Sequence, residues 1–251
     1  MRLKGKTALI TGAGQGLGFA FARRLAEDGA DIIIVDLAKA EDAASQIREL
    51  GVRSIGVTAD VSKEDEVTRA FAEGLSCTGR VDILVNNAAI FEMSVVPFET
   101  IGVEAWTRTM NVNLLGTYLF CRAVVPQMRK QGGGGRIINL ASGTALKGVP
   151  GKLHYVASKA ALIGFTRALA RELGKDNITV NVLAPGLTLS DGVIQRGGQD
   201  EQRLAAQRRS RALQRDEKPE DLVGAVSFLA SDDAAFMTGQ TLAVDGGSAM
   251  I

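Results

Sequence analysis

Short apolar runs alternate with longer amphipathic segments along the chain, and turn-forming residues separate them. Apolar runs of about four to eight residues indicate buried strands, whereas apolar residues at every third or fourth position indicate helices. Alternating strands and helices imply one α/β domain over residues 1–251, a doubly wound and mainly parallel sheet of about seven strands with helices on both faces. The pattern predicts strands over residues 7–10, 32–35, 55–62, 80–89, 135–142, 178–184 and 240–244. It predicts helices over residues 19–28, 104–129, 155–174 and 219–230, and the capped start of a further helix at Ser62 and Asp65.

A glycine-rich turn follows the first predicted strand. Gly12, Gly16 and Gly18 form the pattern G-x-x-x-G-x-G, and the second predicted strand ends on Asp36. Strand, glycine turn, helix, strand and acid together form the βαβ unit that binds a dinucleotide in Rossmann-type sheets. The glycines let the backbone turn tightly and approach the pyrophosphate, which the helix N-terminus faces.

The acid at the end of the second strand indicates which dinucleotide is bound. A carboxylate there can accept hydrogen bonds from the adenosine ribose and would repel a 2′-phosphate. Residues 13–15 have no basic side chain for such a phosphate, and Lys39 does not directly follow Asp36. The sequence therefore predicts NAD rather than NADP.

Several polar side chains follow the predicted strands at the point where they end. Asn87, Ser142 and Pro185 occupy such positions, and the carboxyl edge of a parallel sheet is where ligands bind. Tyr155 and Lys159 are four residues apart on a predicted helix, so they share one face. An ammonium group near a phenol lowers the phenol's pKa from about 10, which favours proton transfer at a carbonyl or alcohol oxygen.

Two other polar residues each allow two interpretations. Asn113 falls inside a predicted helix, where asparagine is disfavoured, so it is either a solvated or capping amide or the site of a functional kink. His154 is the only histidine. It is interpreted as a packing or exposed residue rather than a general base, because Tyr155 and Lys159 already fill that role.

The chain resembles the short-chain dehydrogenase/reductase family over essentially its whole length. The resemblance implies a catalytic set of Asn113, Ser142, Tyr155 and Lys159. Ala89 is a departure, because the family usually has glycine there. The matching elements are residues 11–18, Asp60-Val61, residues 86–88, Asn113, Ser142, Tyr155 with Lys159, Pro185-Gly186 and residues 245–247. The cofactor contacts that it implies are Gly12, Gln15, Gly16, Leu17, Gly18, Asp36, Leu37, Asp60, Val61, Asn87, Ala88, Tyr155, Lys159, Pro185, Gly186, Leu187 and Thr188.

The same resemblance implies an activity. The segments 164–170, 228–233 and 238–247 look most like NAD-dependent members such as 1-phenylethanol dehydrogenase and pyridoxal 4-dehydrogenase. Hydride would pass between a secondary alcohol and the nicotinamide, with Tyr155 taking the alcohol proton and Ser142 holding the reacting oxygen. Lys159 would hold the nicotinamide ribose, and Asn113 would support a water relay. Two alternatives stay open: an NADPH-dependent 3-oxoacyl-[acyl-carrier-protein] reductase, and a catalytically silent nucleotide-binding regulator.

Residues 187–217 occupy the position of the family's substrate lid. Its arginines form either a solvated face or a site for a carboxylate or phosphate of the substrate. Apolar pocket walls would favour a hydrophobic, aromatic or alicyclic alcohol over a sugar. The arginines are Arg196, Arg203, Arg208, Arg209, Arg211 and Arg215, and the expected pocket walls are Phe91, Met93, Leu146, Val149 and Val193.

Composition and charge limit the partners and bound groups that this protein is expected to have. A net charge of +1 gives no electrostatic reason to expect nucleic acid or an anionic membrane as a partner. Cys77 and Cys121 lie outside any C-x-x-C pattern, so neither a disulfide framework nor a metal site is expected. No signal peptide or membrane-spanning segment is recognised, and a reduced, cytoplasmic setting is predicted. The Tyr155 helix is apolar nearly all round, which predicts subunit contact, and the family resemblance implies a homotetramer.

Overall fold

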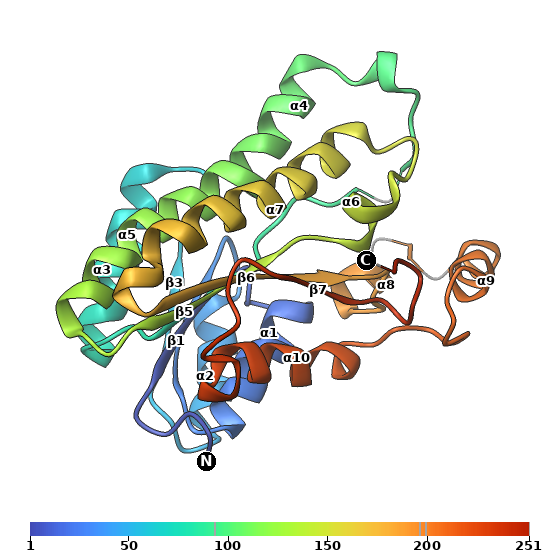
Figure 1. Cartoon of the computed structure of the whole chain (residues 1–251). Helices are drawn as coiled ribbons and strands as arrows, with labels where there is room; N and C mark the ends of the chain where they lie inside the picture. Colours follow the sequence, from blue (N-terminus) through green and yellow to red (C-terminus); the bar gives the residue numbers. More distant parts are fainter. Residues whose placement is uncertain (93, 196, 199, 251) are drawn as a thin grey trace.

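The fold is a parallel sheet between two layers of helices (Figure 1). The computed structural model describes residues 1–92, 94–195, 197–198 and 200–250. Every strand pair within the described residues is parallel, in the order β3-β2-β1-β4-β5-β6-β7. This confirms the predicted doubly wound sheet. The strands are β1 Thr7–Thr11, β2 Asp31–Asp36, β3 Ser54–Thr58, β4 Ile83–Asn86, β5 Gly135–Leu140, β6 Ile178–Pro185 and β7 Thr241–Val244.

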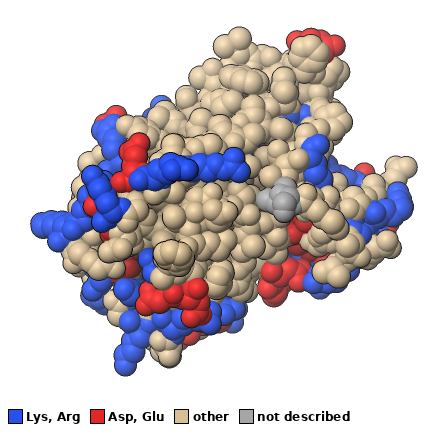
Figure 2. Space-filling view, in the orientation of Figure 1, with Lys and Arg blue, Asp and Glu red and all other residues tan. Residues whose placement is uncertain are grey.

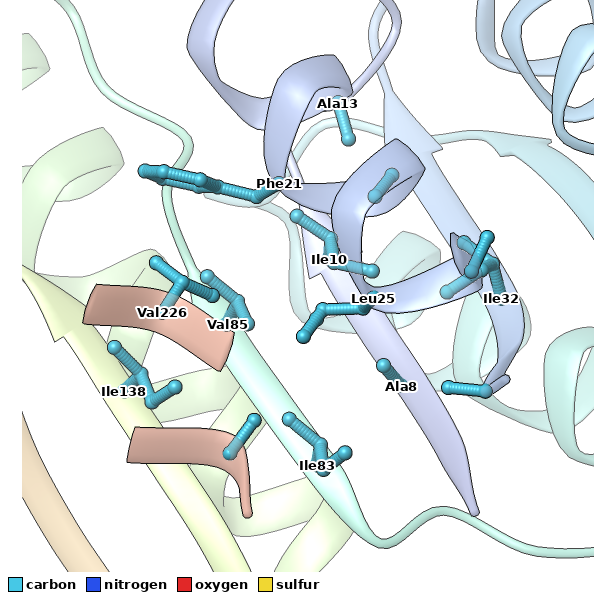
Figure 3. Close-up of a cluster of buried hydrophobic side chains, with 14 of the residues drawn as sticks. Ala8, Ile10, Ala13, Phe21, Leu25, Ile32, Ile83, Val85, Ile138 and Val226 are labelled. Carbon is cyan, nitrogen blue, oxygen red and sulfur yellow. The ribbon is translucent and has the colours of Figure 1, made fainter. Parts of the chain in front are cut away.

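Two hydrophobic clusters, one on each face of the sheet, hold the helices in place. Phe21 and Leu25 of α1 meet Ile10, Val85 and strand residues beside them under α1, α2 and α10 (Figure 3). The opposite cluster lies under α3, α5 and α7 (Figure 1). Fully burying one such side chain contributes about 1.5–3 kcal/mol. The helices are α1 Gly16–Glu27, α2 Ala40–Arg48, α3 Glu64–Thr78, α4 Val103–Met110, α5 Gly116–Gln131, α6 Gly143–Lys147, α7 Leu153–Leu173, α8 Asp191–Gln195, α9 Glu201–Arg209 and α10 Glu220–Ala230.

The strand order places a crevice at the carboxyl edge of the sheet. From β1 the chain builds outward to β2 and β3, then returns to add β4 on the other side of β1. The connections after β1 and β4 therefore leave the sheet in opposite directions, and ligands bind at such a switch point. The glycine turn and the segment after β4 are consequently neighbours.

The predicted helix over residues 104–129 is interrupted. A π-helical turn, Asn111–Leu115, separates α4 from α5 and contains Asn113. An extra residue in one helical turn breaks the regular hydrogen-bond ladder, and such π-turns often mark functional sites. The Asn113 side chain is fully buried, so the solvated-amide interpretation is wrong.

Three other sequence predictions need correction. The helix after β3 has no side-chain cap, because Ser62 donates its hydroxyl proton to Asp60 instead, 2.7 Å away. The strands predicted over residues 55–62 and 80–89 are shorter than expected, because only Ser54–Thr58 and Ile83–Asn86 pair with neighbouring strands. The segment between β5 and α7 contains the short helix α6, which the hydrophobic pattern did not predict.

Charged side chains of both signs lie around the rim of the face shown in Figure 2, and its middle is largely uncharged. Across the described residues, none of the helices combines the length and apolar character needed to traverse a bilayer.

Candidate active site

Tyr155 and Lys159 lie one turn apart near the start of α7, as the sequence predicted. Lys159 is buried, and its Nζ donates a hydrogen bond to the backbone oxygen of Leu140 at 2.6 Å. The same Nζ lies 6.0 Å from the centre of the Tyr155 ring. The end of β5 therefore fixes the lysine charge beside the phenol.

Burial changes the acidity of both groups. It raises the pKa of Tyr155 to about 12, and a hydrogen bond with Ser142 acts in the opposite direction. Burial also lowers the pKa of Lys159 to about 7. A low-dielectric environment disfavours the charged form of each group. The expectation that Lys159 brings the pKa of Tyr155 below its usual value is therefore wrong for the chain alone.

Ser142 follows β5 and caps the N-terminus of α6. Its Oγ accepts hydrogen bonds from the backbone N–H of Thr144 at 3.2 Å and from the Thr144 hydroxyl at 3.0 Å. Because both bonds use the oxygen as acceptor, the Ser142 proton can be donated to Tyr155 or to a ligand oxygen. Ser142 and Tyr155 line the same cavity.

Asn113 ties three segments together behind this cavity. Its Oδ1 accepts from the backbone N–H of Ile90 at 2.7 Å, and its Nδ2 donates to the Ile90 oxygen at 3.2 Å and to the Ser158 Oγ at 3.0 Å. Ser158 in turn donates to the backbone oxygen of Tyr155 at 2.7 Å. Asn113 thus fixes the segment after β4 against the first turn of α7, and its part in a water relay stays a prediction.

The glycine turn closes against the ends of β2 and β4. Asp36 accepts hydrogen bonds from the backbone N–H groups of Gly14 at 2.8 Å and Ala38 at 3.2 Å. Asn87 donates to the backbone oxygens of Thr11 at 2.9 Å and Gly12 at 2.8 Å. The sequence had placed Asn87 at the ligand edge without foreseeing that its amide holds the turn.

The same turn has the form that a pyrophosphate requires. A Cβ at Gly18 would lie 2.2 Å from the Gly12 oxygen, so only glycine permits this close packing. Gly16 has a positive φ of 62°, and the capping residue of α1, Gln15, makes no side-chain cap. The first N–H groups of α1 are therefore open to an anion, and the residues present fit a dinucleotide.

A cavity of about 190 Å³ joins these parts at the sheet edge. Of the expected pocket walls, Phe91, Val149 and Val193 line it, Leu146 does not, and Met93 lies outside the described residues. Leu146 packs instead on the small cluster of Ala141, Val182 and Ala184. Besides Tyr155 and Lys159, the predicted cofactor residues that line the cavity are Leu17, Asn87, Pro185, Gly186, Leu187 and Thr188.

The other predicted cofactor residues surround this cavity without lining it. Asp36 and Leu37 come at the end of β2, and Asp60 and Val61 come just after β3. Leu37 is exposed, whereas Val61 is buried. Ala88 follows β4, and Gly12, Gln15, Gly16 and Gly18 belong to the glycine turn or the start of α1. Their contacts with a cofactor stay predictions.

Ion pairs between arginines and acidic residues of the same segment stabilise the basic segment 187–217. Arg208 pairs with Asp216 at 2.9 Å and also with Glu201, and Arg211 lies 3.5 Å from Glu217. Arg211 and Glu217 are both buried, so the interpretation of these arginines as a solvated face is wrong for Arg211.

The remaining lid arginines differ in their surroundings. Arg215 pairs with Asp221 at 2.6 Å, Arg209 is exposed, and Arg203 lines the cavity. Arg196 lies outside the described residues.

Lys152 was missed by sequence reasoning. Only 4% of its surface is exposed, and it lines the cavity three residues before Tyr155. A lysine in a glycine-containing loop gives no sign of burial, because the contacts that bury it come from the distant segment after β4. His154 is also buried, which agrees with its interpretation as a packing residue.

Comparison with known proteins establishes the relationship. A family model described as enoyl-(acyl carrier protein) reductase matches residues 12–249. The chain is 40% identical to the short-chain dehydrogenase/reductase eriH of Hericium erinaceus, over 98% of each chain. The chain belongs to the short-chain dehydrogenase/reductase family. The family resemblance drawn from the motifs is therefore confirmed.

Other proteins of the family also match this chain over nearly its whole length. This short-chain dehydrogenase/reductase is 38% identical to the 3-oxoacyl-[acyl-carrier-protein] reductase FabG of Staphylococcus epidermidis, over 98% of this chain and 99% of the relative. A solved structure from Sinorhizobium meliloti, assigned to the short-chain alcohol dehydrogenases, superposes with a TM-score of 0.92 at 33% identity. That match covers 98% of this chain and 97% of the other. The chain is thus an oxidoreductase of this family.

Proposed function

We propose that the protein is an NAD-dependent oxidoreductase that interconverts an apolar secondary alcohol, aromatic or alicyclic, and its ketone. The observation that supports this most is that Ser142, Tyr155 and Lys159 line one cavity at the carboxyl edge of the sheet. The glycine turn and Asp36 lie at the same edge. Tyr155, the proposed proton-transfer group, therefore lies at the same sheet edge as the glycine turn that would bind the dinucleotide.

Residues of this chain would carry out the proton transfer of the reaction. Bound NAD would supply the hydride acceptor. In alcohol oxidation the Tyr155 phenolate takes the hydroxyl proton, and Ser142 donates a hydrogen bond to the reacting oxygen as its charge changes. Protonated Lys159, held by the Leu140 oxygen, attracts the phenolate and so opposes the burial that raises the pKa of Tyr155. The buried setting strengthens that attraction.

Asp36 supports NAD over NADP. Its carboxylate lies beside Gly14 and Ala38, at the end of β2, where the adenosine ribose binds in such folds. A 2′-phosphate placed there would meet a negative charge. Lys39, the nearest basic residue in the sequence, makes only a weak hydrogen bond to Gln15, at 3.5 Å.

A second candidate is the reduction of a 3-oxoacyl group on an acyl carrier protein. The 38% identity with the Staphylococcus epidermidis reductase favours it. It predicts activity with acetoacetyl thioesters and NADPH. A silent nucleotide-binding regulator would have a broken catalytic set, whereas all four residues of the set are present in this chain.

We also propose a homotetramer. The outer face of α7 carries small residues, and Leu153 at its start is 47% exposed. Trp106 on α4 and Tyr118 on α5 are exposed on neighbouring helices. Phe120, also on α5, is fully buried in the core and does not contribute to this surface. Light scattering of the purified chain should give four times the monomer mass of 26.4 kDa, and a monomer would contradict this assembly.

A substrate panel tests the function. Aromatic, alicyclic and sugar alcohols are offered with NAD and with NADP, and the reduced cofactor is followed by absorbance. We expect turnover with NAD and with aromatic or alicyclic secondary alcohols. Activity confined to acetoacetyl thioesters with NADPH would instead support the second candidate.

A further inference from the structure

The cavity beside Tyr155 is strongly cationic. Among the described residues, its lining includes Lys147, Lys152, Lys159 and Arg203. No aspartate or glutamate is among these lining residues. The whole chain has almost equal numbers of basic and acidic residues, 29 and 28, so this imbalance is local to the cavity. Lys159 has a role beside Tyr155, which leaves three cations without a function in the proposed reaction.

Lys152 is the most unusual of these cations. It is almost completely buried, with 4% of its surface exposed. Its Nζ donates one hydrogen bond, to the backbone oxygen of Glu92 at 2.6 Å, and lies 4.3 Å from the centre of the Phe91 ring. An ammonium group has three donors, so two of its N–H bonds have no hydrogen-bond acceptor among the described side chains and backbone.

A buried ammonium of this kind is costly unless an anion accompanies it. Burial lowers the pKa of Lys152 to about 8, and the nearby charge of Arg203 acts in the same direction. The Glu92 carboxylate opposes this shift and lines a small neighbouring pocket together with Lys152, but it does not line the cavity itself. Lys152 and Arg203 thus line the same cavity, where an anionic ligand would relieve the repulsion between them.

The position of Lys152 relative to Tyr155 defines where such an anion would lie. The Phe91 ring contacts both, with its centre 4.3 Å from the Lys152 Nζ and 5.3 Å from the centre of the Tyr155 ring. The ammonium group and the phenol that meets the reacting oxygen therefore lie near the same aromatic side chain on one cavity wall. A substrate that reaches both would carry its negative group at a different end from the carbinol carbon, with an apolar part of the size of an aromatic ring between them.

Arg203 approaches the same wall from the lid. It is on α9, at the end of the molecule where Figure 2 shows further basic side chains. Lys147 is exposed at the end of α6, and its Nζ donates to the Ser248 Oγ at 2.6 Å. The three cations come from α6, the start of α7 and the lid, so the cationic wall is a product of the tertiary fold. Phe91, Val149 and Val193 give the cavity its apolar part.

We propose that the substrate of this site carries a carboxylate, bound by Lys152 and Arg203, at the end of an apolar body opposite to the reacting alcohol. This inference rests on the proposed alcohol dehydrogenase function and narrows its substrate class to apolar hydroxy acids. The uncharged wall holds the hydrocarbon part, Tyr155 and Ser142 meet the alcohol oxygen, and the Lys152 ammonium group binds the acid. A bound carboxylate also compensates for the burial of Lys152.

A matched pair of substrates tests this proposal. In 4-(1-hydroxyethyl)benzoate an aromatic ring separates the carboxylate from the carbinol, and 4-(1-hydroxyethyl)benzamide has the same shape without the charge. We expect the acid to have a kcat/KM at least about tenfold higher than the amide with NAD at pH 7, mainly through a lower KM. An acid-to-amide ratio at or below one would overturn the proposal.

Variants of the chain assign the preference to named residues. Lys152→Met should lower the acid-to-amide ratio about tenfold or more, and Arg203→Gln should lower it in the same direction. Lys152→Arg should restore much of the preference because it restores the charge. Arg209→Gln is the matched control, since Arg209 is exposed on the same helix as Arg203 and does not line the cavity. An unchanged ratio in both Lys152→Met and Arg203→Gln, with circular dichroism showing folded protein, would contradict the assignment.

A binding measurement separates this inference from the proposed function. Calorimetry compares 4-acetylbenzoate with 4-acetylbenzamide in the presence of NAD, which requires no turnover. Oxidation of 1-phenylethanol without any preference for acids would leave the function standing and overturn the inference. Binding of 4-acetylbenzoate that depends on Lys152, with no oxidation of any alcohol, would support the anion site and overturn the function.

Discussion

Replacing Tyr155 with phenylalanine is expected to lower kcat for alcohol oxidation by about a thousandfold or more, while NAD still binds. The variant keeps the ring that packs edge-on against Phe91, at a centroid separation of 5.3 Å, so the cavity wall should be preserved. It loses only the oxygen that takes the substrate proton. No other described side chain with a hydroxyl, apart from Ser142, Thr144, Thr188 and Ser190, lines the cavity. Aliphatic hydroxyl groups are far weaker acids than a phenol, so they do not substitute for Tyr155.

The chain provides a matched control for this substitution. Tyr118 is the other tyrosine, is 44% exposed on α5 and does not line the cavity. Tyr118→Phe should retain the wild-type rate, and NAD binding to both variants can be measured by calorimetry. Near-normal turnover in Tyr155→Phe would refute the assignment of Tyr155 as the proton-transfer group.

Replacing Asp36 with asparagine or alanine is expected to raise the NADP-to-NAD ratio of specificity constants by about tenfold to a hundredfold. The reason is electrostatic: a carboxylate close to the 2′ position repels a phosphate there, and a pair of charges about 4 Å apart interacts by several kcal/mol at an effective dielectric constant near 20. Asp36→Asn removes the charge and keeps one oxygen to accept from Gly14 or Ala38. Asp36→Ala removes both hydrogen bonds as well.

Comparing the two variants separates charge from positioning. If the ratio rises equally in both, charge decides cofactor choice; if it rises only in Asp36→Ala, the turn itself must rearrange. Asp31→Asn serves as the control, because Asp31 begins the same strand and pairs with Arg53 at 2.7 Å. A ratio that stays at the wild-type value in both Asp36 variants would argue against a role for Asp36 in cofactor choice.

Some site features could be predicted because they depend only on residue types and spacing within a short segment. Tyr155 and Lys159 are placed by helical periodicity alone, and Gly12, Gly16 and Gly18 by the turn that they must form. The acidity of Tyr155 could not be predicted in this way. Its direction of shift depends on how deeply the ring is buried, which is set by Phe91 and by segments far away in the chain.

For Asn113, too, the sequence raised the question and the tertiary structure answered it. Its type and position inside a predicted helix showed that it needed an explanation, but not which one. The structure provides it through the π-helical turn and the three hydrogen bonds to Ile90 and Ser158. A π-turn depends on tertiary partners for its side chains, so propensity along the sequence does not reveal it.

The sequence by itself determined the parallel sheet, the glycine turn and the one-turn spacing of Tyr155 and Lys159, because each depends on hydrophobic period or on spacing within one or two elements. The catalytic set of Asn113, Ser142, Tyr155 and Lys159 came from the family resemblance and stays a prediction. Only the tertiary structure decided that Leu146 lies away from the cavity, that Arg211 is buried against Glu217, and that Lys152 faces the cavity. Burial and electrostatic surroundings arise when distant segments pack together. The spacing of Tyr155 and Lys159 could therefore be read from the sequence, whereas the cationic lining of the cavity could not.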